Sequence, residues 1–270
     1  MFCSIMLSHK DLSLAALVLL AIVGLGQAAP PNGRVVNGTD SSIEAYPFVI
    51  SLRGPTGSHS CGGSIVSQQF VMTAAHCTAS RTPDQLSVQY GVTKINSAGP
   101  NVVGVMKIIQ HELYNPYNNY ANDISLLMVK VPFVFDYITV APVKLPELAF
   151  ATPQTENGGE GVLIGWGLNA TGGTIQTTLQ EVNLKVYSDE ECTTRHKGAT
   201  DPRYHICGGV DEGGMGQCSG DSGGPLLYGG LQVGIVSWSV KPCTVAPYPG
   251  VYCRVAQYID WIKKSQIILA

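Results

Sequence analysis

The sequence predicts an all-β fold, either a sandwich or a barrel, on three observations. Short runs rich in β-branched and aromatic residues recur along most of the chain, and turn residues separate them at regular intervals. Glycine is abundant, with 31 residues among 270, and helix signals are few. Evenly spaced short strands with turns between them are typical of sandwiches and barrels. The length leaves room for one large domain or two small ones.

The expected strands fall into two groups, separated by residues 132–161. This segment holds four prolines and the run QTENGGEG, and we interpret it as a linker between two β halves. One helix is expected at the end of the chain, where Val255, Tyr258, Ile259 and Ile262 recur at helical spacing. The expected strands are 48–52, 63–66, 70–73, 86–89, 102–109 and 124–129 before the linker, and 162–164, 182–186, 231–238 and 250–255 after it.

The first 28 residues predict a secretory signal peptide. An apolar run of about fifteen residues covers 12–26, with Lys10 before it and the small residues Ala28 and Ala29 after it. A membrane anchor is the alternative interpretation, but a helix needs about 20 apolar residues to cross a bilayer. We therefore expect a secreted, extracellular protein cleaved after Ala28 that has no contact with a membrane.

Export makes the cysteines interpretable as disulfides. Of the eight cysteines, Cys3 leaves with the signal peptide, so seven remain, and three disulfides with one free thiol is the simplest arrangement. Six cysteines allow 15 pairings, and spacing alone does not choose among them. The net charge of −3 includes no basic block, so nucleic acid is not an expected partner.

The run GDSGG over residues 220–224 makes Ser222 a candidate nucleophile. A serine hydroxyl needs an adjacent base to react, and flanking glycines let the backbone bring N–H groups to the reacting oxygen. An α/β-hydrolase elbow also fits the run, but that fold places its histidine after the serine. The last histidine is His205, which excludes that fold.

The base must therefore lie upstream of the serine. His76 lies in VMTAAHC, and Asp123 lies in NDISLLMV at the entrance to an apolar run. A zinc site is not expected, because neither HExxH nor a paired CxxC occurs. The other histidines between the signal and the serine are expected to be solvent or loop residues. They are His59, His111, His196 and His205.

Five motifs in order carry a resemblance to the chymotrypsin-like (trypsin-fold) serine protease family: TAAHC, NDISLL, GWG, GDSGGPL and SWS. The resemblance runs from residue 35 to about 266. It implies two packed antiparallel β-barrels with a C-terminal helix and an active site in the cleft between them. It also implies that Ser222 attacks the scissile carbonyl, that His76 moves the proton, and that Asp123 orients the imidazole. The N–H groups of Gly220 and Ser222 would receive the oxyanion.

The same resemblance implies activation of a zymogen by an activating protease. The segment R–VVNG predicts cleavage between Arg34 and Val35, which would release residues 29–34 and leave a peptidase domain over 35–270. In such enzymes the new α-amine pairs with the aspartate before the nucleophile, here Asp221. A non-catalytic homologue that acts as a binding or immune protein is the rival class.

The expected specificity pocket carries no charge. Gly216 stands two positions before Cys218, where trypsin-type enzymes have Asp, and the other walls are expected at Ser239 and Gly250. A Lys or Arg side chain would lose its hydration there without gaining a partner. The sequence thus favours a chymotrypsin-like preference for large apolar or aromatic residues, with elastase-like specificity as the alternative. Ser237, Trp238 and Ser239 are expected to pair with the substrate backbone as an added strand.

The resemblance also selects three disulfides, Cys61–Cys77, Cys192–Cys207 and Cys218–Cys243, and leaves Cys253 unpaired as a small buried hydrophobe.

The loop where some relatives bind calcium corresponds to residues 92–101, which lack Asp and Glu, so no metal and no cofactor are expected. Asn37 and Asn169 are candidate glycosylation sites. We expect a monomer whose partners are protein or peptide substrates and proteinaceous inhibitors.

Overall fold

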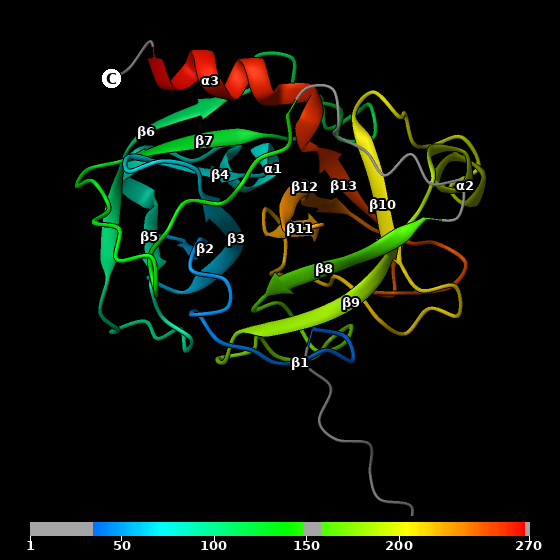
Figure 1. The fold of residues 1–270 in the computed structure, drawn as a ribbon, viewed down its shortest axis with the longest axis horizontal. Coiled ribbons are helices and arrows are strands. Elements are labelled where there is room, and N and C mark those ends of the chain that lie inside the picture. The colour runs from blue at the N-terminus through cyan, green and yellow to red at the C-terminus, as the bar shows by residue number, and fades with distance from the viewer. Residues whose placement is uncertain (1–34, 148–157, 268–270) are drawn as a thin grey trace, which may run out of the picture. The chain divides into compact units, whose positions relative to one another are not determined.

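Two closed, six-stranded antiparallel β-barrels form the described part of the chain, residues 35–147 and 158–267, in this computed structural model (Figure 1). In the first barrel the strands follow the order β2-β3-β4-β7-β6-β5, and β5 closes on β2. Their bounds are β2 Val49–Arg53, β3 His59–Ile65, β4 Phe70–Thr73, β5 Ser87–Tyr90, β6 Val102–Gln110 and β7 Ser125–Val129.

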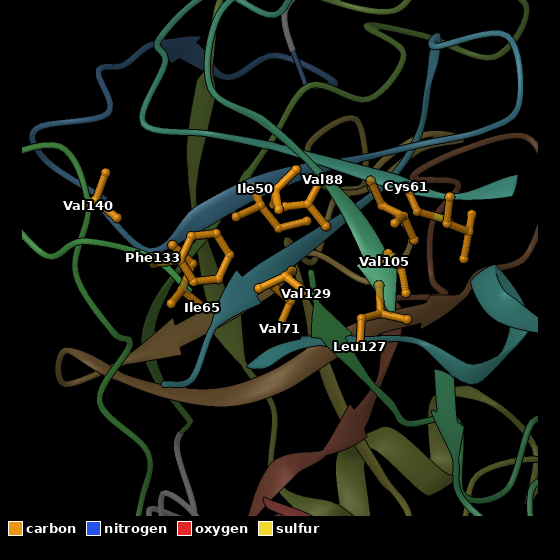
Figure 2. Close-up of a cluster of buried hydrophobic side chains, with 13 residues drawn as sticks. Ile50, Cys61, Ile65, Val71, Val88, Val105, Leu127, Val129, Phe133 and Val140 are labelled. Atoms are coloured by element: carbon orange, nitrogen blue, oxygen red, sulfur yellow. The ribbon is translucent and has the colours of Figure 1, made fainter. Parts of the chain in front are cut away.

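Apolar side chains that alternate along the strands fill the first barrel. In β6, Val103 and Val105 are buried while Val102 is exposed, as the two-residue period of a strand requires. They join side chains from the other strands in one cluster, and Phe133 and Val140 lie toward one end of it (Figure 2). This packed interior makes the first barrel a rigid support for the loops at its rim.

The second barrel follows the order β9-β10-β13-β12-β11-β8, and β8 closes on β9. Along β9, Val182, Leu184 and Val186 are buried, and Asn183 between them is exposed. The short β1 adds to the edge of β9. The bounds are β1 Thr39–Asp40, β8 Gly159–Gly165, β9 Gln180–Val186, β10 His205–Gly209, β11 Pro225–Tyr228, β12 Leu231–Trp238 and β13 Gly250–Arg254.

The C-terminal helix α3 (Ile259–Ile267) packs against the first barrel, next to β6 and β7 in Figure 1. The 3-10 helix η2 (Val255–Tyr258) connects it to β13. One buried cluster combines Met72 and Leu126 of the first barrel with Ile235 and Cys253 of the second and Ile262 of α3. This shared core holds the two barrels together beside the loops that carry the candidate catalytic residues.

The predicted class, the ten expected strands and the final helix are confirmed, with shifts of up to a few residues at the ends. Three strands were not predicted, because β10 contains two glycines, β11 begins with proline and β1 has two residues. The expected linker ends too late, since β8 already begins at Gly159. Three short helices were also missed: α1 (Ala75–Thr78), η1 (Pro83–Gln85) and α2 (Asp189–Arg195).

All three predicted disulfides are present, and Cys253 is free and buried. The predicted signal peptide, the propeptide and Arg34 lie outside the described residues. Within the described part of the chain, no helix combines the length and apolar character needed to cross a membrane.

Candidate active site

The Asp123 carboxylate holds His76 through two hydrogen bonds. His76 lies in α1, three residues after β4, and Asp123 lies two residues before β7, the strand that pairs with β4. Asp123 Oδ2 lies 2.8 Å from His76 Nδ1, and Oδ1 accepts from the His76 backbone N–H at 2.8 Å. Since a carboxylate only accepts, Nδ1 carries the proton, and Nε2 of the neutral ring is the basic nitrogen.

Ser237 belongs to the same network, a role that the sequence did not indicate. Its hydroxyl donates to Asp123 Oδ2 at 2.6 Å, and Asp123 is fully buried. Three hydrogen bonds thus offset the loss of hydration of this carboxylate, which a buried charge requires. Ser237 lies on β12, so this bond ties the Asp123–His76 pair of the first barrel to the second.

Ser222 and His76 line one cavity of about 270 Å³. Among the described residues, no hydrogen bond joins Ser222 Oγ to His76 Nε2. Such bonds in unliganded enzymes are often long and tighten when substrate binds. Cys61 and Cys77 also lie beside His76, but their sulfurs form a disulfide and offer no thiolate to a metal.

The backbone around Ser222 leaves two N–H groups free for an oxyanion. In the described chain, the N–H groups of Gly220 and Ser222 have no internal acceptor, whereas those of Asp221 and Gly223 bond to Cys218 O and Val236 O. The peptide before Gly220 is fixed because its carbonyl accepts from Leu168 N at 2.8 Å. Since a trans peptide directs its N–H opposite to its C=O, the Gly220 N–H is fixed as well.

Gly220 must be glycine for two reasons. Its φ is +95°, in the region that side chains disfavour, and a Cβ would lie 2.6 Å from Ile175 Cδ1 and 3.1 Å from Gly167 Cα. His59 Nε2 donates to the Gly220 carbonyl at 2.9 Å, and Nδ1 lies 2.7 Å from Ser51 Oγ. The expectation that His59 is a solvent or loop residue is therefore wrong, because it supports the oxyanion loop.

The same expectation is wrong for His196 and His205, which are both buried. The His196 ring packs against Trp238 with centroids 5.1 Å apart, and its Nε2 bonds to Pro249 O at 2.9 Å. A single histidine among polar residues has no spacing that reveals such a partner. The sequence therefore carried no signal for these roles.

Acidification from pH 6.5 towards 4 is expected to destabilise the fold through His59. Burial lowers the pKa of the His59 imidazole to about 4. The unfolded chain, with a pKa near 6.5, then binds more protons in this window, so stability falls as the pH falls, by up to about 3 kcal/mol. Urea unfolding of the wild type and of His59→Gln at pH 7.5 and 4.5 isolates this contribution, because every other titrating group is common to the two proteins. Acidification should destabilise the wild type relative to the variant by about 3 kcal/mol. The same change in stability in both proteins would contradict the assignment.

Asp221 is the most strongly perturbed carboxyl group beside the nucleophile. It is fully buried, and it accepts from Gly167 N at 2.8 Å and Cys218 N at 2.9 Å. Burial raises the pKa of this carboxyl to about 7, although the two hydrogen bonds oppose that shift. No cation in the described chain forms an ion pair with it.

The predicted activation segment borders the predicted pocket. Val35 is fully buried in the core cluster of the second barrel. Val36 pairs with Gly216 in an isolated antiparallel bridge, in which Gly216 N donates to Val36 O at 3.3 Å. A change at the start of the peptidase domain can therefore reach the pocket directly.

The predicted pocket residues do not line one continuous slot. Ser237, Trp238 and Ser239 line the cavity that holds His76 and Ser222. Gly216 and Gly250 instead line a second cavity of about 10 Å³. Gln217, the residue directly after Gly216, lines both cavities.

Five residues that line the active cavity were not predicted as site residues: Tyr120, Gln217, Ser219, Val236 and Lys241. Tyr120 packs edge-on against His76 with ring centroids 5.8 Å apart, and its φ of +59° shows a constrained loop. Gln217 and Lys241 also line this cavity. Gln217 could have been suspected from its place between Gly216 and Cys218, but nothing in the sequence places Tyr120 near His76.

One closed β-barrel supplies the Asp–His pair, and the other supplies a serine with two free N–H groups beside it. This arrangement defines a serine hydrolase of the chymotrypsin fold. A family model described as Trypsin matches residues 35–262. The chain belongs to this family of serine proteases.

Curated relatives match nearly the whole chain. Trypsin eta of Drosophila erecta is 35% identical over 92% of this chain and 96% of its own length. Chymotrypsin-2 of Vespa crabro is 38% identical over 86% of this chain and all of its own. Trypsin alpha-4 of Lucilia cuprina is 36% identical over 91% of this chain and 95% of its own. These names include both trypsins and chymotrypsins, so similarity leaves the specificity open.

Proposed function

We propose that the protein is a secreted serine endopeptidase that hydrolyses peptide bonds through an acyl-enzyme. The observation that carries the proposal is the Asp123–His76 bond of 2.8 Å in a cavity shared with Ser222. The mature chain would act as a monomer on protein and peptide substrates. Asn37 is exposed and Asn169 half-buried, and we include both as glycosylation sites in the proposal.

In this mechanism Ser222 Oγ attacks the scissile carbonyl while His76 Nε2 takes its proton. Asp123 stabilises the imidazolium that forms, and the Gly220 and Ser222 N–H groups bind the oxyanion. His76 then gives the proton to the leaving amine, and the acyl group remains on Ser222. Water, activated by His76, hydrolyses the ester and restores the serine.

Activation is proposed to follow cleavage between Arg34 and Val35 by another protease. The new α-amine of Val35 would pair with Asp221, which forms no ion pair in the described chain and interacts only with the more distant charge of Lys241. The oxyanion loop would then be held in its productive form. The burial of Val35 and its position before the bridge to Gly216 support this proposal.

The proposed specificity excludes Lys and Arg before the scissile bond. Gly216 offers no anion, and Lys241 places a cation on the wall of the active cavity, where its Nζ lies 3.2 Å from Cys243 Sγ. A basic side chain would thus be desolvated beside a like charge. Trp238 and Ser239 add apolar and uncharged walls, which supports an uncharged residue at this position.

The proposal is tested with peptide anilides that differ only in the residue before the scissile bond. For the processed enzyme, kcat/KM for Arg should be at least about 10³-fold below that for the best of Ala, Val, Leu and Phe, since burying an unpaired cation costs several kcal/mol. Lys241→Ser should raise the Arg value, but should leave Arg below the uncharged residues. Fastest turnover of the Arg substrate would overturn the proposed specificity.

A further inference from the structure

The Gln217 side chain crosses the predicted specificity pocket from wall to wall. Its Nε2 donates to the Trp238 carbonyl of β12 at 2.7 Å. On the same side, a Cβ built on Gly250 of β13 would lie only 2.7 Å from Gln217 Cδ. The side chain begins on the loop before Cys218 and ends against two strands of the second barrel.

This side chain lies between the active cavity and the small cavity that Gly216 and Gly250 line. Gln217 and Ser239 line both the cavity of about 270 Å³ that holds Ser222 and the cavity of about 10 Å³ that holds Gly216 and Gly250. The smaller space accommodates about one water molecule and no amino-acid side chain. A substrate side chain that enters beside Ser222 therefore meets Gln217 before it reaches Gly216.

Gln217 is also held rigidly in this position. It is only 4% exposed, and its hydrogen bond to the Trp238 carbonyl fixes which end of the amide faces β12, because a carbonyl only accepts. Its Oε1 is buried and has no partner among the described residues. Moving the side chain aside would break the bond to Trp238, so a long substrate side chain has to displace an anchored group.

We propose that Gln217 sets the depth of the primary specificity pocket and restricts the enzyme to short uncharged side chains, such as Ala, Val and Thr, before the scissile bond. This inference rests on the proposed peptidase function and decides between the two uncharged specificities that the sequence left open. Large aromatic residues are rejected by the Gln217 side chain, although Gly216 and Gly250 lie beyond it.

The test compares wild-type enzyme with Gln217→Ser and Gln217→Met, each produced as the full chain and processed after Arg34. Substrates are peptide anilides with Ala, Val, Leu or Phe before the scissile bond. Wild-type kcat/KM should be at least tenfold higher for Ala or Val than for Phe. Gln217→Ser should raise the ratio of the Phe value to the Ala value at least tenfold, because it shortens the side chain and also removes a buried acceptor that has no partner among the described residues.

Gln217→Met is the matched variant, since it keeps the length of the side chain without the amide. It should keep the Phe-to-Ala ratio within threefold of the wild-type ratio, and melting temperatures should show that both variants fold. Fastest wild-type turnover of Phe, an unchanged Phe-to-Ala ratio in Gln217→Ser, or a Phe-to-Ala ratio in Gln217→Met as high as that in Gln217→Ser would overturn the inference. A processed wild type that turns over none of the four substrates would contradict the proposed function itself.

Discussion

Ser222→Ala is expected to lower kcat on the best peptide anilide by about 10⁶-fold, the scale seen when a serine peptidase loses its nucleophile. The geometry explains the size of this effect. His76 is held by Asp123 with Nε2 as its basic nitrogen, so it has no serine proton to accept once the hydroxyl is gone. The free N–H groups of Gly220 and Ser222 remain and leave a residual rate above that in water. Steady-state kinetics at known concentrations of folded protein measures the loss.

The His76→Ala variant provides the internal check on this prediction. If the two residues act as a unit, the double variant should be no slower than either single one, because such effects are not additive. Ser97→Ala is the matched control, since Ser97 is exposed and only its backbone carbonyl contacts Arg53. Losses that multiply in the double variant, or a Ser222→Ala enzyme within tenfold of wild type, would contradict the assigned roles.

Cleavage after Arg34 is expected to raise activity by about 10³-fold and to stabilise the fold at alkaline pH. The first effect follows because an oxyanion donor typically contributes 10²–10³ in kcat, and Asp221 adjoins both donors. The second follows from the raised pKa of Asp221, about 7. In the uncleaved chain the folded state favours the neutral form of this carboxyl, so ionising it lowers the free energy of unfolding. This loss is absent below pH 3.8, grows between pH 3.8 and 7, and reaches about 4 kcal/mol above that range.

The measurement compares the uncleavable Arg34→Gln chain with the processed chain at pH 5 and pH 8. An α-ammonium paired with Asp221 should remove most of the penalty, which corresponds to a gain of about 10 °C in Tm at pH 8 and a smaller gain at pH 5. Asp221→Asn in the uncleaved chain should flatten its pH dependence, since the amide does not ionise. Full activity of the Arg34→Gln chain, or equal gains at both pH values, would contradict the activation scheme.

The fold could be predicted wherever the strand pattern is strong. Strands 70–73 and 231–238 were placed as the structure has them, because runs such as FVMT are bounded by polar turns. The segments that were missed lack that pattern. β11 begins with proline, and α2 depends on the capping box formed by Ser188 and Glu191, a local signal that is independent of strand periodicity.

The site could be predicted only where its residues lie in motifs. His76, Asp123 and Ser222 each stand in a short run, and the disulfides followed from the same resemblance. The hydrogen bonds of Ser237 to Asp123 and of His59 to Gly220 join residues that lie more than 100 positions apart. The position of Gln217 across the pocket depends on its rotamer, which the sequence does not specify. The depth of the pocket was therefore beyond sequence reasoning.

We propose that Asp123 and His76 make Ser222 a nucleophile once the chain is processed. Mass spectrometry of the processed protein after treatment with a fluorophosphonate probe tests it most directly. We predict one covalent adduct, on the peptide that contains Ser222, and its loss in the His76→Ala variant. An unlabelled Ser222 in correctly folded, processed protein, or equal labelling without the imidazole, would contradict the account.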